Sequence, residues 1–237
     1  MFKVRMILFV LLSAIGLLAT SAVASARTGP VWHVNGVKLA AGETRLIRGE
    51  NFAGSLVKLK STVLGTAVTI YCSAAKIEGK LIGGNPGKDE ETIEYSSCSV
   101  EGAAGCEVTL GRTKASTELG YESSTSSQIV EVYNAAGAFT TVTIKKRSGE
   151  TCLLTLNTTE VRLLKEDKYD VACVDTHQEV EEYSGLYMCV EPALSLVELG
   201  GQSVAVGMEI GGQPATLTAD LLFKMLTEEL KFGAYKE

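Results

Sequence analysis

Apolar and polar residues alternate with a period of two along most of the chain after residue 27. The segment TAVTIYC places Val68, Ile70 and Cys72 on one face and leaves threonine and tyrosine on the other. The same alternation recurs in three later segments, 106–110, 151–156 and 203–210. A period of two buries one face of a sheet and leaves the other in water. Each segment is therefore predicted to be a half-buried strand, and Val204, Val206, Met208 and Ile210 of the last one are expected to share a face.

Turn-forming residues separate these runs. Asn35-Gly36 lies between two β-favouring runs in VWHVNGVKL, which is a strong signal for a tight hairpin. The segments 83–91, GGNPGKDEE, and 122–128, ESSTSSQ, are predicted to be loops. No amphipathic helical pattern interrupts the strands, so parallel βαβ units are disfavoured. The predicted fold class is all-β: an antiparallel sandwich or barrel-like domain stapled by disulfides.

One segment, 217–232, fits two structures. As a helix it would gather Leu222 and Leu226 on one stripe, whereas as a strand it would align Leu221 with Phe223. We favour a strand, a turn and a second short strand, because the alternation is continuous before the polar residues that follow.

The N-terminus has the order of a secretory signal peptide. Lys3 and Arg5 precede an uncharged apolar run, and small residues then lead to an A-x-A site that ends at Ala26. We therefore expect a signal peptide over residues 1–26 and an all-β domain over 27–237, with two packed β subdomains as the alternative division of that region. No second long apolar segment follows, so no integral membrane segment is expected after cleavage. The expected location is secreted or associated with the cell envelope.

The net charge of the chain limits the classes of partner that it is expected to bind. The formal net charge is −6, with 22 basic and 28 acidic residues. Nucleic acids require a basic footprint, so they are not expected partners. An envelope or extracellular partner is expected instead.

The six cysteines are Cys72, Cys98, Cys106, Cys152, Cys173 and Cys189. An even number in an exported chain favours disulfides. Zinc and thioredoxin-like sites both use C-x-x-C pairs, which this sequence lacks. Two sets of pairings remain open. The preferred set joins Cys98–Cys106 across a hairpin turn, Cys173–Cys189 and Cys72–Cys152, and its rival joins Cys72–Cys98 and Cys106–Cys152.

The stretches WHVNGVKLAAGE, VTIYC and GGNPGKDEETIEYSSCSVEGAAGCEV, and more weakly TCLLTL and GGQPATLTADLLFKM, carry a resemblance. Together they resemble an uncharacterised family of secreted, β-rich, disulfide-containing proteins from actinobacteria. Cys173 and Cys189 depart from that family's pattern, and the resemblance thereby favours their pairing with each other. The family implies no activity, ligand or cofactor.

The sequence contains few features that indicate a catalytic site. The two histidines, His33 and His177, lie outside any nucleophile motif, and neither G-x-S-x-G nor S-x-x-K occurs. A hydrolase could use carboxylates from two acidic clusters, but both clusters are expected to be solvated: Asp89, Glu90, Glu91 and Glu94, and Asp175, Glu179, Glu181 and Glu182. Asn85, Asp89 and Glu91 form only part of a calcium ligand set. The sequence therefore assigns no catalytic, metal or cofactor residue.

These observations predict an exported, non-enzymatic structural or interaction protein. The alternative is a module that binds a polysaccharide or a small ligand, and a carboxylate-dependent hydrolase ranks third. Sugar binding is disfavoured because aromatic residues make up only 6% of the chain and the single tryptophan, Trp32, is expected to anchor the first hairpin. An exposed aromatic groove would favour binding, and paired acids in a cleft would favour hydrolysis.

Overall fold

The computed structural model describes residues 28–63, 65–126, 128–134, 137–163, 170–174, 186–189, 195–227 and 230–237. These residues form strands and turns, with no helix among them, so the predicted all-β class is confirmed. The strands are β1 (Val31–Val34), β2 (Val37–Lys38), β3 (Thr44–Asn51), β4 (Val57–Val63), β5 (Thr66–Ile82), β6 (Lys88–Val100), β7 (Cys106–Leu110), β8 (Thr113–Tyr121), β9 (Ile129–Asn134), β10 (Ala138–Lys146), β11 (Leu156–Leu163), β12 (Asp170–Val174), β13 (Leu186–Cys189), β14 (Ser195–Leu199), β15 (Gln202–Val206), β16 (Met208–Ile210), β17 (Gln213–Thr218), β18 (Asp220–Met225) and β19 (Phe232–Tyr235).

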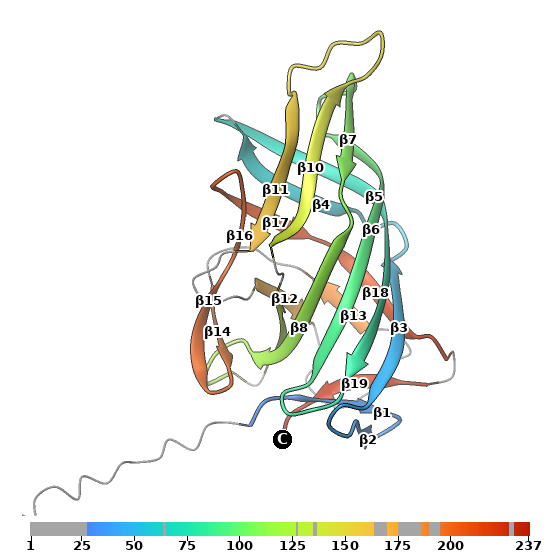
Figure 1. The fold of residues 1–237 in the computed structure, drawn as a ribbon, viewed down its shortest axis with the longest axis vertical. Coiled ribbons are helices and arrows are strands. Elements are labelled where there is room, and N and C mark those ends of the chain that lie inside the picture. The colour runs from blue at the N-terminus through green and yellow to red at the C-terminus, as the bar shows by residue number, and fades with distance from the viewer. Residues whose placement is uncertain are drawn as a thin grey trace, which may run out of the picture.

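Sixteen of these strands belong to one antiparallel sheet that curls into a half-barrel (Figure 1). In one part of it, β5, β6, β8, β9, β12, β13, β18 and β3 pair in that order, and β3 pairs again with β5. The series of paired strands in this part therefore begins and ends at β5. In the other part, β5 pairs with β4, and the sheet continues through β17, β16, β11 and β10 to β7.

The long β5–β6 hairpin is shared by both parts. In β5 the buried positions are Val68, Ile70 and Cys72 before the middle of the strand, and Ala75 and Ile77 after it. The parity of the buried face changes between Cys72 and Ala75, and the ladder to β6 is interrupted there. The β5–β6 register is the same on both sides of this point, so no residue is inserted, and the change of buried face coincides with Ser97 of β6, which has a positive φ.

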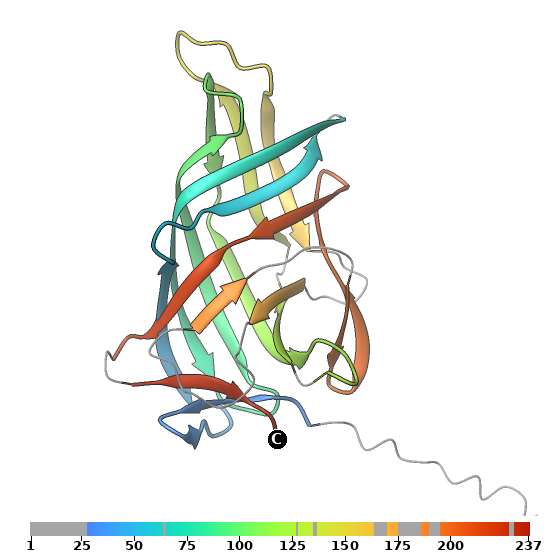
Figure 2. The same ribbon diagram turned by 180° about the vertical axis from the view of Figure 1, so that it is seen from behind.

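A small sheet of β19, β1 and β2 lies across one end of the curled sheet (Figures 1 and 2). Its Trp32 is fully buried beside Phe232, with ring centroids 6.1 Å apart, and the Trp32 Nε1–H donates to the Lys88 carbonyl at 3.0 Å. Trp32 therefore fastens the small sheet to β6. The expected anchoring role of Trp32 is confirmed, and so is the hairpin, in which Asn35 and Gly36 both have positive φ.

Several predicted strands form as expected. Cys106, Val108 and Leu110 share a buried face in β7. The segment 217–232 contains strand and turn, and Leu221 and Phe223 are both buried in β18.

Three local predictions were wrong. The predicted loop 83–91 ends at residue 87, because Lys88–Glu91 already pair with both β5 and β8. The predicted strand 151–156 begins only at Leu156. The run 203–210 divides at Gly207 into β15 and β16, so Val204 packs in a separate small cluster from Met208 and Ile210.

The preferred disulfide set was wrong in two of its pairs, and its rival is confirmed. Cys72 is joined to Cys98 and Cys106 to Cys152. The pairing Cys98–Cys106 fails because β7 pairs with β10 and has no ladder to β6. Cys72 and Cys98 are instead direct neighbours in the β5–β6 ladder. Cys173 and Cys189 are paired residues of the β12–β13 ladder, and their side chains lie outside the described part of the chain, so their disulfide stays a prediction.

The described residues contain no helix long and apolar enough to cross a membrane.

Candidate functional sites: a buried acid cluster and an outer groove

Three carboxyl groups lie inside the part of the sheet where the pairing is continuous. Asp89 and Glu91 come from alternate positions of β6, and Glu131 comes from β9. Their exposed fractions are 1%, 4% and 2%. Among the described residues, the buried polar set contains no lysine or arginine. A buried carboxylate without a cation is costly, so these groups must be protonated or hydrogen-bonded to one another.

The hydrogen bonds of the cluster converge on Asp89. The Thr117 hydroxyl on β8 donates to Asp89 Oδ2, and Thr117 is the residue directly opposite Asp89 in the ladder. The Glu131 carboxyl is also hydrogen-bonded to Asp89. The Tyr133 hydroxyl donates to Glu91 Oε2 at 3.2 Å. Asp89 Oδ1 and Glu131 Oε2 have no hydrogen-bond partner among the described residues.

This environment favours the protonated acids. Burial raises the pKa of Asp89 to about 7, although hydrogen bonds from Thr117 and Glu131 oppose the shift. Burial and the neighbouring Asp89 raise the pKa of Glu91 and of Glu131 well above the usual range of glutamate.

The alternation of side chains along β6 therefore divides the predicted acidic cluster between the two faces of the sheet. Asp89 and Glu91 point inward, whereas Glu90 and Glu94 point outward and form ion pairs with Lys80 and Arg112 at 2.8 and 3.3 Å. The expectation that the whole cluster is solvated was wrong for its two inward members. Among the described residues, no three His, Cys, Asp or Glu side chains are grouped to hold a metal ion. Asn85, the third member of the partial calcium set, donates instead to Glu237 Oε2 at 2.5 Å.

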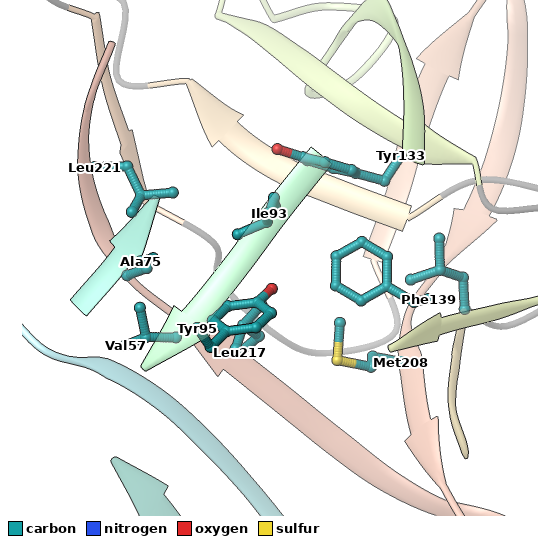
Figure 3. Close-up of a pocket in the computed structure, with 11 residues that line it drawn as sticks. Val57, Ala75, Ile93, Tyr95, Tyr133, Phe139, Met208, Leu217 and Leu221 are labelled. Atoms are coloured by element: carbon teal, nitrogen blue, oxygen red, sulfur yellow. The ribbon is translucent and has the colours of Figure 1, made fainter. Parts of the chain in front are cut away.

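An apolar cavity lies next to this cluster inside the sheet. Figure 3 shows its lining side chains, among them Tyr95, Tyr133, Phe139 and Met208, gathered from several strands around one space. Its volume is about 20 Å³. A single water molecule needs roughly 10–15 Å³ on this measure, and ligand pockets occupy roughly 300–1,000 Å³. The cavity is therefore a packing void and is too small to hold an organic ligand.

The outer face of the same sheet carries a much larger hollow, of about 800 Å³. We call it the Phe52 groove. Its lining residues are Arg48, Gly49, Glu50, Asn51, Phe52, Ala53, Gly54, Ser55, Leu56, Ser73, Ala74, Ala75, Lys76, Ile77, Ser96, Leu222 and Lys224. Phe52 is 46% exposed and Leu56 is 38% exposed.

The groove forms where β3 and β4, which both pair with β5, separate from each other. The β3 ladder reaches β5 only as far as Lys76, and the β4 ladder begins at Cys72. The turn that joins β3 to β4 bridges this gap. Asn51 holds the turn in place, because its amide oxygen accepts from the Ala75 N–H and its amide nitrogen donates to the Ser55 carbonyl at 3.2 Å. The Ser55 hydroxyl further fastens the turn to the Asp220 carbonyl at 3.0 Å.

The charge of the groove is opposite to that of the chain. Its charged lining residues are three bases, Arg48, Lys76 and Lys224, and one acid, Glu50. Arg48 and Lys224 are direct neighbours across the β3–β18 ladder. The chain as a whole has a formal net charge of −6, whereas the charged residues that line the groove include more bases than acids. Lys76 forms an ion pair with Glu78 at 2.7 Å.

A second outer hollow, of about 630 Å³, lies over β5, β6 and β8. Its charged lining residues include both signs, and Lys80 and Glu90 form the ion pair described above. Its one exposed apolar side chain is Leu46. It therefore lacks both the aromatic side chain and the positive balance of the Phe52 groove.

The other residues that the sequence singled out lie away from both sites or outside the described part of the chain. His33 stacks on Tyr235 with ring centroids 4.1 Å apart, which confirms a packed strand histidine. His177 and the acids Asp175, Glu179, Glu181 and Glu182 lie outside the described residues. Sequence reasoning missed Phe52, and the segment GENFAG offered a signal, since an aromatic residue flanked by polar and small residues is expected at an exposed turn.

No protein-family model, curated protein or solved structure matches this chain.

Proposed function

We propose that this chain is an exported, non-enzymatic binding protein of the cell envelope or extracellular space, and that its partner binds in the Phe52 groove. The observation that carries the proposal is the contrast in size between the inner cavity, about 20 Å³, and this outer groove, about 800 Å³. Of these two, only the groove has the volume of a binding site. Its exposed aromatic side chain is the feature expected of a binding module.

Two further observations support this proposal. The two disulfides are consistent with an oxidising extracellular environment. The acids with raised pKa values are almost wholly buried, so they lack the contact with substrate that a hydrolase needs. A broad hydrolase screen of the oxidised protein is therefore expected to stay at background. Activity that Asp89→Asn abolishes would contradict the non-enzymatic assignment.

The proposal is tested by co-sedimentation of the mature, oxidised protein with the envelope fraction of the cells that produce it. Wild type is expected to sediment, and Phe52→Ser is expected to remain largely in the supernatant. The matched control is Leu153→Ser, because Leu153 is 91% exposed and does not line the groove. Failure of wild type to sediment, or equal sedimentation of Phe52→Ser, would overturn the proposal.

A further inference from the structure

We propose that the Phe52 groove is regulated by pH: it binds its partner at acidic pH and releases it as the pH rises above neutral. The inward acids Asp89, Glu91 and Glu131 sense the pH, and the wall between the inside of the sheet and the groove transmits the change. This inference rests on the proposed function and adds the regulation of the same site. It is carried by a continuous series of contacts that leads from the acid cluster to the groove.

The sensor is a group of buried carboxyls. Asp89 Oδ1 and Glu131 Oε2 have no hydrogen-bond partner among the described residues, and both side chains are almost wholly buried. Such groups are stable in a dry interior while they are protonated, because an ionised carboxylate there requires water or a cation. Burial raises the pKa of Asp89 to about 7, so this carboxyl is about one-hundredth ionised at pH 5 and about nine-tenths ionised at pH 8.

In the described part of the chain, the strands around the cluster supply no base to neutralise it. On β3, Arg45 has the parity of the inner face, but its side chain is 42% exposed and forms an ion pair with Glu43. The inner positions of β5 beside the cluster and of β18 are apolar, and β13 contains no charged residue. Glu90 acts on Asp89 from the outer face and is itself an acid. A rise in pH therefore leaves an uncompensated negative charge inside the sheet.

The other titratable groups on these strands add no positive charge. Burial raises the pKa of Tyr95 to about 12 and that of Tyr133 well above its usual value, so both hydroxyls remain neutral up to pH 8. The register of β12 pairs Asp170 with Tyr133, and the register of β14 pairs the buried Glu198 with Tyr121. The neighbours of the cluster are therefore neutral or acidic, and they do not reverse the sign of its response.

Strand β9 is the element that responds to ionisation. It carries Glu131, which is hydrogen-bonded to Asp89, and Tyr133, whose hydroxyl donates to Glu91 at 3.2 Å. The cavity next to the cluster has about 20 Å³, and a single water molecule needs roughly 10–15 Å³. Hydration of a carboxylate by more than one water therefore requires β9 to move away from β6, and Tyr133 moves with it.

The wall of the cavity connects Tyr133 to the groove. Tyr133 and Ala75 line the same inner cavity (Figure 3), and Ala75 also lines the groove on the outer face. The Ala75 N–H donates to the amide oxygen of Asn51, and the Asn51 amide nitrogen holds the turn that carries Phe52. Leu221, which also lines the cavity, is the residue opposite Asn51 in the β3–β18 ladder. The Phe52 turn is therefore held from the inside of the sheet, and a loss of packing at Tyr133 loosens it.

Thermodynamic linkage gives the direction of the effect. The partner binds the form of the protein in which the cluster is protonated, so its affinity is highest near pH 5 and falls as the pH rises through about 7. Because coupling between two sites is reciprocal, a bound partner also raises the pKa of Asp89. Coupling of this kind typically changes an affinity by about 5-fold to 150-fold.

The first test needs no partner: fluorine NMR of the mature, oxidised protein labelled with 4-fluorophenylalanine. Phe139 lies edge-on to Tyr133, with ring centroids 5.8 Å apart, and reports on the inside of the sheet, whereas Phe52 reports on the groove. The two resonances are assigned with Phe139→Leu and Phe52→Ser. Both are expected to change between pH 5 and pH 8 with one shared midpoint.

Variants identify the cluster as the source of that change. Asp89→Asn is expected to abolish the shared change, and Glu90→Gln, which removes the adjacent outward acid, is expected to behave like wild type. If Asp89→Asn does not fold, Glu131→Gln replaces it and must move the midpoint. A Phe139 resonance that changes while that of Phe52 does not would overturn the coupling. Unfolding of the whole protein at pH 8 would overturn it as well, because the release would then not be local.

The second test is co-sedimentation with the envelope fraction at pH 5 and at pH 8. Wild type is expected to bind at least about fivefold less at pH 8 than at pH 5, whereas Asp89→Asn is expected to bind equally at both. The comparison of the two proteins at each pH accounts for titration of the envelope itself. Sedimentation that depends on Phe52 but is equal at both pH values would show that only the regulation is wrong. If wild type does not sediment at pH 5, or sediments independently of Phe52, the proposed function fails and the regulation fails with it.

Discussion

The buried acid cluster makes the stability of this protein depend on pH in the direction opposite to that of most acidic proteins. Asp89 has a pKa of about 7 in the folded chain, whereas an unfolded aspartate has a pKa of about 3.9. The folded state therefore holds the proton more tightly than the unfolded state. By linkage, this contribution is fully present below about pH 4 and is lost as the pH rises through about 7.

The magnitude follows from the difference between the two pKa values. A difference of about 3 units corresponds to about 4 kcal/mol, at about 1.4 kcal/mol for each unit. Glu91 and Glu131 have pKa values raised further, so they extend the loss to higher pH. Hydrogen bonds and ion pairs lower the pKa of Glu78 and Glu237, so these two exposed acids oppose the trend only at acidic pH.

The side chains around the cluster leave the sign of this effect unchanged. Those that face it from β3, β5 and β18 are apolar, and those from β8 are apolar or bear hydroxyl groups. The backbone register of β12 pairs Asp170 with Tyr133, whose hydroxyl contacts Glu91. The charges on the outer face form ion pairs with one another in water and are screened by salt.

The assay is urea unfolding of the oxidised protein from pH 5 to pH 8 at constant ionic strength. The wild-type midpoint is expected to be highest at pH 5 and to fall with each step. Asp89→Asn keeps one oxygen that can accept from the Thr117 hydroxyl but removes the titrating group, so its midpoint should fall much less between pH 5 and pH 7. Glu90→Gln removes an outward carboxyl from the adjacent residue, and its slope should match that of wild type. A wild-type midpoint that rises with pH, or an Asp89→Asn curve parallel to it, would refute this reasoning.

Four other outcomes are expected. Replacing Cys72 and Cys98 with alanine should destabilise the chain by about 3–4 kcal/mol, measured by urea unfolding, because their bridge closes a separation of 26 residues. Thiol titration of the denatured, unreduced protein should detect almost no free thiol, since a third disulfide is predicted; two free thiols would exclude it. Trp32→Ala should cost about 3–5 kcal/mol, and a loss below about 1 kcal/mol would contradict its role as the fastener of the small sheet. N-terminal sequencing of exported protein should begin after Ala26, and an intact Met1 would refute the signal peptide.

Local patterns predicted the elements whose structure is decided locally. The Asn35-Gly36 turn formed as expected, because both residues adopt the positive φ that a tight hairpin requires. The strand around Leu221 and Phe223 also formed, because its alternation matches one buried face. These predictions needed no knowledge of distant partners.

Where the local predictions failed, the structure depends on strand pairing between segments far apart in the sequence. The polar run at residues 88–91 has the composition of a loop, yet it forms a strand because β5 and β8 both pair with it. The disulfide prediction failed for the same reason, since Cys106 follows β7 to β10 and away from Cys98. Phe52 is a candidate binding residue because the ladders of β3 and β4 with β5 are separated, which leaves Phe52 beside a groove. The sequence alone does not show this separation.

Lysine acetylation footprinting, read by mass spectrometry with and without envelope material, tests the central claim most directly. Lys76 and Lys224 line the Phe52 groove, and Lys80 and Lys114 line the second hollow. If the groove is the binding surface, envelope material protects Lys76 and Lys224 and leaves Lys80 and Lys114 as reactive as before. Protection of Lys80 and Lys114 with Lys76 and Lys224 unchanged would contradict the account.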